Sequence, residues 1–168
     1  MELRTEQPGD RPAILRLARS AFGTDGGADP PELALLAALF ECRECIPELS
    51  LVAVDGPDVI GYCISTRGWI GHEPALGLGP LAVLPERRRQ GIGAALLAET
   101  RRRASLLGER VILLLGHTGY YPRFGYRPAA DLGIQAPDPG WGDHFMALPL
   151  ADDVPAGSFC YAAPFNSL

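Results

Sequence analysis

The chain has 168 residues, which is enough for one domain with a sizeable hydrophobic core. Its formal net charge of −5 argues against a nucleic-acid-binding protein, which needs a basic surface. No apolar run is long enough to span a bilayer, and the N-terminus lacks the features of a signal peptide. We therefore expect one domain over residues 1–168 that works in the cytoplasm without membrane or nucleic-acid partners.

The N-terminal third predicts one short strand and two helices. The strand covers Leu3 to Thr5. We expect Asp10 to cap a helix that runs from Pro12 to Phe22, because Asp is a preferred capping residue and Pro suits the first turn. The run Asp29-Pro30-Pro31-Glu32 predicts the start of a second helix, with Asp29 as its cap.

Strand signals dominate the middle of the chain. Leu49 to Val54 and Val59 to Arg67 flank a turn at Asp55 to Asp58 and therefore predict a hairpin. A third strand covers Leu76 to Leu84, and it contains Gly77, Gly79 and Pro80. Because Pro cannot donate to a strand ladder and Gly weakens one, this strand should be bulged or splayed from a neighbour.

The second half predicts one long helix among short strands. The helix covers Gly91 to Leu107, and the fully apolar strand Val111 to Leu115 is expected at the centre of the sheet. A helical turn at Tyr120 to Phe124 and strands at His144 to Leu150 and Ser158 to Ala162 complete the elements. The pattern predicts a mixed α/β (α+β) domain.

A strand, a turn and a glycine-started helix meet between Leu81 and Leu97, and this arrangement favours an anion site. Free amides and the macrodipole at a helix N-terminus attract phosphate, and glycine lets it approach the backbone. A P-loop is excluded because the chain contains no lysine. The dinucleotide pattern G-x-G-x-x-G is incomplete, because Leu96 follows Gly91-Ile92-Gly93-Ala94-Ala95 where a glycine is required.

The run Arg88-Arg89-Gln90-Gly91-Ile92-Gly93 instead resembles R/Q-x-x-G-x-G/A, the pyrophosphate loop of the GNAT family, the Gcn5-related N-acetyltransferases. Tyr121-Pro122-Arg123-Phe124-Gly125-Tyr126 resembles the family's Tyr-x-x-x-Gly-[Phe/Tyr] run at the expected distance. Residues 119–126 and the tail Phe145-Met146-Ala147-Leu148 are most similar to the YhbS-like branch. The specific resemblance covers about Leu76 to Leu150.

The resemblance implies a mostly antiparallel sheet flanked by helices and splayed at the CoA-binding strand. Acetyl-CoA would be the cosubstrate, with its pantetheine along Leu81, Ala82 and Val83 and a strand N–H polarising the thioester. Its pyrophosphate would lie on the backbone amides that run from the loop into the helix, helped by Arg88. These amides belong to Arg89, Gln90, Gly91, Ile92, Gly93 and Ala94.

The resemblance also suggests catalytic residues. Tyr121 falls where the family often keeps a general acid for the leaving thiolate, although an aromatic packing role is the alternative. The position where some members carry a basic carboxylate is Gly77 here, which departs from the pattern. His117 is our candidate base, because neutral imidazole accepts protons near pH 7. His72, Glu73 or a water chain are alternatives.

The sequence thus predicts an N-acetyltransferase that moves acetyl from acetyl-CoA by direct attack of a primary amine on a small molecule or peptide. Transfer to oxygen or sulfur, and a non-catalytic CoA-binding sensor or interaction module, remain alternatives. We expect the acceptor site among the two N-terminal helices and Arg67 to Pro74, which contains Trp69. The C-x-x-C of Cys42 and Cys45 has no second ligand pair, so no metal is expected. A homodimer is possible.

Overall fold

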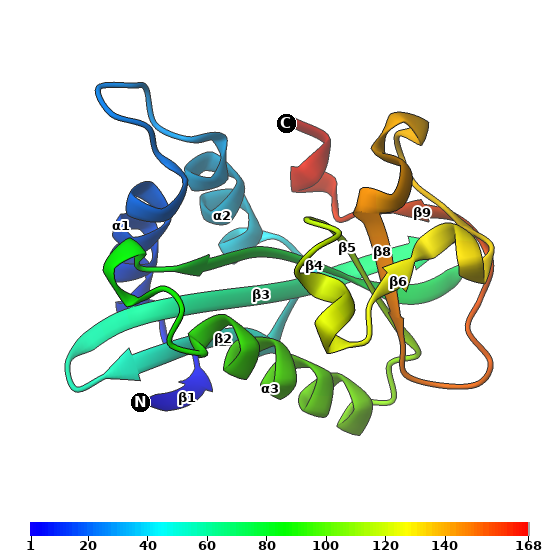
Figure 1. Cartoon of the computed structure of the whole chain (residues 1–168), viewed down its shortest axis with the longest axis horizontal. Coiled ribbons are helices and arrows are strands. Elements are labelled where there is room, and N and C mark those ends of the chain that lie inside the picture. Colours follow the sequence, from blue (N-terminus) through cyan, green and yellow to red (C-terminus); the bar gives the residue numbers. More distant parts are fainter. Residues whose placement is uncertain (168) are drawn as a thin grey trace.

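A mixed, mostly antiparallel sheet runs through the molecule, as Figure 1 shows for a computed structural model that describes residues 1–167. The main path of the sheet has the order β1-β2-β3-β4-β5-β8-β6, while β9 pairs with β3 and β7 pairs with β9. The strands are β1 (Glu2–Thr5), β2 (Cys45–Asp55), β3 (Asp58–Ile70), β4 (Glu73–Val83), β5 (Val111–Leu115), β6 (Arg127–Pro128), β7 (Ile134–Gln135), β8 (Phe145–Pro149) and β9 (Gly157–Cys160).

Strands β4 and β5 are the pair that opens the sheet. They run parallel and are paired only at Leu76 with Ile112 and Gly77 with Leu113, after which they separate. On its other side β4 stays antiparallel to β3, with one extra β4 residue between the pairs Ser65–Leu78 and Cys63–Leu81. The predicted bulge and splay of this strand are therefore confirmed.

Three α-helices cover the two faces of the sheet: α1 (Arg11–Phe22), α2 (Pro31–Glu41) and α3 (Ile92–Leu106). Helices α1 and α2 lie on one face and α3 lies on the other (Figure 1). The alternation of side chains along β3 explains both cores, because Tyr62 and Ile64 pack with α1 and α2 while Cys63 packs with α3.

Short 3-10 helices complete the fold. They cover Pro8–Asp10, Pro85–Arg87, Tyr121–Phe124, Ala129–Leu132, Pro139–His144 and Ala163–Ser167. A third core cluster joins the C-terminal strands to the sheet, with Phe159 of β9 buried against Phe145 of β8. The C-terminal segment thereby returns to the sheet beside the end of β3, where Phe159 pairs with Ile70.

Asp10 lies at its predicted cap position without bonding the helix amides, and the predicted cap Asp29 is not the cap residue of α2. Asp10 stands at the N-cap position of α1, but its carboxylate accepts from Arg4 at 2.7 Å and from the Gln7 amide at 2.7 Å. The N-cap of α2 is Pro30, not Asp29, and the Asp29 carboxylate accepts from Arg19 at 3.2 Å. Each carboxylate binds an arginine, which is a stronger partner than a helix amide alone.

No helix within the described residues could cross a bilayer.

Candidate active site

Two cavities lie beside the opening between β4 and β5, and they share Phe22 and Leu81. The first has a volume of about 740 Å³ and includes the start of α3. We call it the arginine-lined cavity, because it is lined by Ala21, Phe22, Leu81, Ala82, Val83, Arg87, Arg88, Arg89, Gly91, Ile92, Gly93, Ala94, His117, Tyr120, Arg123 and Phe124. It carries four arginines and no carboxylate among these residues.

The start of α3 presents free backbone amides to the arginine-lined cavity. Gly91 is the N-cap with φ 81°, and no side chain caps the helix. The first intrahelical bond runs from Ala95 N–H to the Gly91 carbonyl at 3.0 Å, so the amides of Ile92, Gly93 and Ala94 precede the helical ladder. This is the arrangement that binds anions at a helix N-terminus.

The loop before α3 is held in a special conformation. Arg89 has φ 63°, which is uncommon for a residue with a side chain. Arg87 donates to Asp55 at 3.0 Å and to Gln90 at 3.1 Å, while Arg88 donates to the Ala21 carbonyl of α1 at 3.2 Å. These contacts fix the loop against β2 and α1 before any ligand arrives. Gln90 thus contributes its backbone to the loop while its side chain holds Arg87.

Glycine at position 93 is required by close packing. A Cβ atom there would lie 2.7 Å from the Tyr120 hydroxyl. Arg123 lies over the Tyr120 ring, with its guanidinium carbon 4.9 Å from the ring centre. Tyr120 and Arg123 therefore form the wall opposite the helix start.

Strand β4 supplies the floor between the cavities. Its residues Leu81, Ala82 and Val83 pair with β3 on one side, whereas their edge towards β5 lies beyond the last paired residues. Backbone groups on that edge are free to bond an extended ligand as an added strand would.

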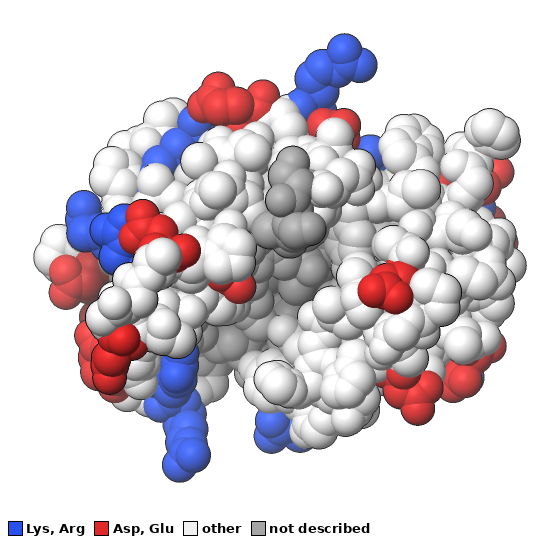
Figure 2. Space-filling model, turned by 90° about the horizontal axis from the view of Figure 1, so that it is seen from above, with Lys and Arg blue, Asp and Glu red and all other residues white. Residues whose placement is uncertain are grey.

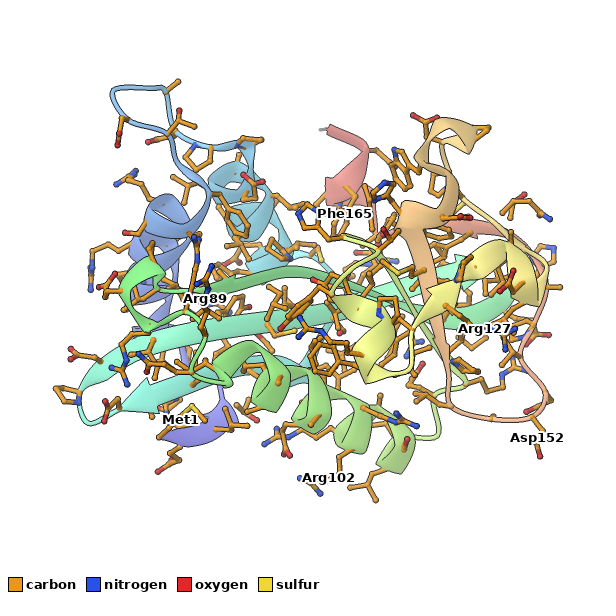
Figure 3. The ribbon with its side chains drawn as sticks, viewed as in Figure 1. Met1, Arg89, Arg102, Arg127, Asp152 and Phe165 are labelled. Atoms are coloured by element: carbon orange, nitrogen blue, oxygen red, sulfur yellow. The ribbon has the colours of Figure 1, made fainter. Side chains whose placement is uncertain are left out.

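The second cavity has a volume of about 880 Å³. We call it the aromatic cavity, because six of its lining residues are aromatic. It is lined by Phe22, Pro31, Glu32, Leu35, Leu78, Gly79, Pro80, Leu81, Leu114, Leu115, Tyr121, Ala136, Pro137, Trp141, Ser158, Phe159, Cys160, Tyr161, Phe165 and Asn166. In Figure 3 Arg89 lies on the loop before α3 and Phe165 on the C-terminal 3-10 helix, so the two labels mark one wall of each cavity.

Tyr121 lines the aromatic cavity, whereas its neighbour Tyr120 lines the arginine-lined one. A Cβ atom on Gly116 would clash with the Tyr121 ring, so this glycine lets the ring lie against the end of β5. Burial raises the pKa of the Tyr121 hydroxyl above its ordinary value of 10. The hydroxyl is therefore protonated near neutral pH and has a proton to give, while burial makes it a weaker acid than a free tyrosine.

His117 does not share a cavity with Tyr121. Its exposed side chain lines the arginine-lined cavity, and its carbonyl accepts from the amides of Tyr120 at 3.1 Å and Tyr121 at 3.3 Å. The alternatives His72 and Glu73 are absent from the described lining of both cavities, and Glu73 binds Arg110 at 2.5 Å. His117 and Tyr121 are only four residues apart in the chain, but their side chains line different cavities.

The departure at Gly77 has a steric cause. A Cβ atom there would lie 2.7 Å from the ring of Tyr161 and 3.5 Å from Phe159. The C-terminal aromatic residues therefore occupy the space that a carboxylate at this position would need.

Only some of the segments that we expected at the acceptor site line the aromatic cavity. Helix α2 and the end of α1 contribute as expected, but Arg67 to Pro74 is absent from the described lining of either cavity, and Trp69 is 44% exposed. The segment from Ala136 to Asn166 forms that wall instead. The density of aromatic residues at Phe159, Tyr161 and Phe165 was the available signal.

Comparison with known proteins identifies the family. A family model described as "Acetyltransferase (GNAT) domain" matches residues 47–128. The uncharacterised N-acetyltransferase YjhQ of Escherichia coli K12 is 36% identical over an alignment of 135 residues, which covers 77% of this chain and 72% of YjhQ. The chain belongs to the GNAT acetyltransferase family. The predicted resemblance and the predicted activity class, an N-acetyltransferase, are thereby confirmed.

Solved structures of GNAT proteins share the whole fold. YhbS from Escherichia coli in complex with CoA has a TM-score of 0.88 and 31% identity, covering 98% of this chain and 91% of its own. A GNAT acetyltransferase from Brucella melitensis in complex with acetyl-CoA has a TM-score of 0.80 and 31% identity, covering 98% and 97%. These matches confirm the predicted fold class. Among the described residues, no group of three or more His, Cys, Asp or Glu side chains could hold a metal ion.

Proposed function

We propose that this GNAT protein transfers acetyl from acetyl-CoA to a primary amine that enters through the aromatic cavity. The observation that carries the proposal is the meeting of two cavities at Leu81, beside the free edge of β4. The arginine-lined cavity includes the start of α3 and carries four arginines, whereas no arginine is among the described lining residues of the aromatic cavity. Two structural relatives were solved in complex with CoA and acetyl-CoA, which supports acetyl-CoA as the cosubstrate.

The arginine-lined cavity is suited to the phosphate end of acetyl-CoA. The pyrophosphate would accept bonds from amides between Arg89 and Ala94, with Arg88 adding charge. The pantetheine would then follow Leu81, Ala82 and Val83, whose edge towards β5 is open. A strand amide there would bond the thioester oxygen and stabilise the negative charge that develops on it.

The chemistry at Leu81 is a direct displacement. The amine nitrogen forms a bond to the thioester carbon, the carbon–sulfur bond breaks, the nitrogen loses one proton and the sulfur gains one. We assign the proton for sulfur to the Tyr121 hydroxyl, which lines the aromatic cavity together with Leu81 and afterwards regains a proton from water. The nitrogen proton leaves through water. His117 would receive it only by such a relay, because its side chain lines the other cavity.

Three further expectations rest on the sequence alone: one domain over residues 1–168, a cytoplasmic location and a possible homodimer. The first and third are tested by limited proteolysis and by sedimentation of the purified chain. One protected fragment and a mass of 18.0 kDa in solution would support a single-domain monomer and exclude the dimer.

Two measurements test the function. Calorimetry should show saturable binding of CoA and none of NAD or ATP, because neither competing phosphate motif is complete. Release of free thiol from acetyl-CoA, measured across a panel of amines, alcohols and thiols, should occur with amines. CoA binding without thiol release from any acceptor would instead support the non-catalytic module, and turnover confined to alcohols or thiols would replace the N-acetyl assignment.

A further inference from the structure

The aromatic cavity has an unusual charge pattern for a site that admits a polar substrate. Glu32, in the first turn of α2, is the only residue with a formal charge among the described lining residues. Its side chain is partly exposed, and it makes no ion pair with any other described residue. Figure 2, which looks down on the edge where α2 and the C-terminal segment lie, shows a hollow whose surroundings are mostly uncharged.

The aromatic wall of the cavity packs closely against the sheet. Tyr161 stacks on Phe165 with ring centres 4.5 Å apart and meets Phe159 edge-on at 4.8 Å. Two glycines make room for these rings, since a Cβ on Gly68 would lie 2.6 Å from Phe159 and one on Gly77 would lie 2.7 Å from Tyr161. The aromatic wall is therefore a fixed feature of this fold and not a loose surface cluster.

The lining of the aromatic cavity favours some acceptor molecules over others by charge as well as by shape. A primary amine with a pKa near that of lysine, about 10.4, reaches the cavity as an ammonium cation, and it gives this proton to water before it attacks the thioester. Aromatic rings attract such a cation, and the Glu32 carboxylate attracts it further. A carboxylate or phosphate on the same acceptor would be desolvated with no arginine or lysine among the described lining residues to pair with it.

We propose that the acceptor is a small arylalkylamine: a primary amine on an apolar, ring-sized body that carries no carboxylate or phosphate. The ring packs against the cavity side of Trp141, Tyr161 and Phe165, and Glu32 guides the cationic nitrogen at the entrance. A volume of about 880 Å³ suits a small molecule of this kind. This inference rests on the proposed function, since it names the substrate class of the same site.

The test compares three amines by thiol release from acetyl-CoA. Phenethylamine is the expected substrate, phenylalanine adds only a carboxylate, and n-butylamine has an ethyl group in place of the phenyl ring. We expect kcat/KM for phenethylamine to exceed that for each of the others by on the order of 10- to 100-fold. Equal use of phenylalanine, or equal use of n-butylamine, would overturn the inference while leaving the amine acetyltransferase standing.

Glu32→Gln tests the guiding charge. It should raise KM for phenethylamine by on the order of 3- to 10-fold and narrow the gap to phenylalanine, with kcat and CoA affinity unchanged. Glu41→Gln is the matched control, because Glu41 ends the same helix and is absent from the described lining of both cavities. An unchanged KM in Glu32→Gln, or an equal rise in both variants, would contradict the role of Glu32.

A binding measurement separates this inference from the proposed reaction. Phenethylamine is titrated into the CoA-loaded protein while the fluorescence of Trp141 is followed, in a Trp69→Phe background that removes the other tryptophan. Saturable quenching by phenethylamine, weaker with phenylalanine, supports the acceptor class even if no amine is acetylated. Absence of phenethylamine binding overturns it even if another amine turns over.

Discussion

The two cavities that meet at Leu81 differ in charge and in how the chain builds them. The arginine-lined cavity has four arginines and takes most of its wall from one continuous stretch, Leu81 to Ala94. The aromatic cavity has one carboxylate and gathers residues from many separated segments between Phe22 and Asn166. A local backbone loop can bind a phosphate, because amides at a helix start suffice. Selection of an acceptor needs side chains that only the complete fold brings together.

The largest expected effect is a loss of turnover that distinguishes Tyr121 from its neighbour Tyr120, which lines the other cavity. Tyr121→Phe keeps the ring and removes the proton, so turnover should fall by about 10- to 1,000-fold with unchanged affinity for CoA. Tyr120→Phe, in the arginine-lined cavity, should keep kcat and change at most the KM for acetyl-CoA. Thiol-release kinetics and CoA calorimetry on both variants provide the check. Equal turnover in the wild type and a folded Tyr121→Phe protein would remove Tyr121 from the mechanism.

The next effect concerns the start of α3. Gly91→Val should weaken CoA binding by about 10- to 100-fold, the scale of one or two lost charge-assisted hydrogen bonds. The variant introduces both a side chain and strain, because Gly91 has φ 81°. Gly108→Val is the matched control, since Gly108 has φ 80° at the other end of the same helix.

Both glycine variants should lose similar stability in thermal unfolding, but only Gly91→Val should lose CoA affinity in calorimetry. If the affinity falls equally in both, strain in the helix explains the loss and the anion site at Gly91 is disproved.

Sequence patterns predicted the arginine-lined cavity much better than the aromatic one. The splay of β4 followed from Gly77, Gly79 and Pro80, and each acts through local backbone chemistry. The surroundings of His117 and of the aromatic cavity could not be read from the sequence for the opposite reason. The direction of His117 depends on the turn that follows β5, and the wall depends on where β9 returns to β3. Long-range pairing follows from no local motif, and the aromatic residues near the C-terminus indicate a buried segment without indicating its partner strand.

A smaller effect tests whether Tyr161 is the reason for glycine at position 77. Gly77→Ala should destabilise the fold by about 1–3 kcal/mol, the usual cost of overpacking, because its Cβ would meet the Tyr161 ring at 2.7 Å. Gly71→Ala is not a suitable control, since Gly71 has φ 60° and carries its own strain.

The informative comparison is a double-mutant cycle with Tyr161→Leu. If the ring is the obstacle, Gly77→Ala should cost less in the Tyr161→Leu background than in the wild type. Denaturant unfolding of the four proteins measures the coupling, and strictly additive losses would show that the cost at position 77 has another source.

The smallest effect concerns the half of α3 that is remote from both cavities. Arg102 and Arg103 donate to Glu99 and hold its pKa at about 2, below the ordinary 4.5, while Arg103 also donates to Thr5 at 2.7 Å. A lowered folded pKa stabilises the fold above pH 4.5, and this contribution disappears as the pH falls towards 2. Glu99→Gln should therefore cost about 0.5 kcal/mol at pH 7, since Arg102 is largely exposed and screened. The difference from wild type in urea unfolding should shrink below pH 4.5, with CoA affinity at pH 7 unchanged. A loss of affinity would mean that the remote half of the helix positions the amides at its start.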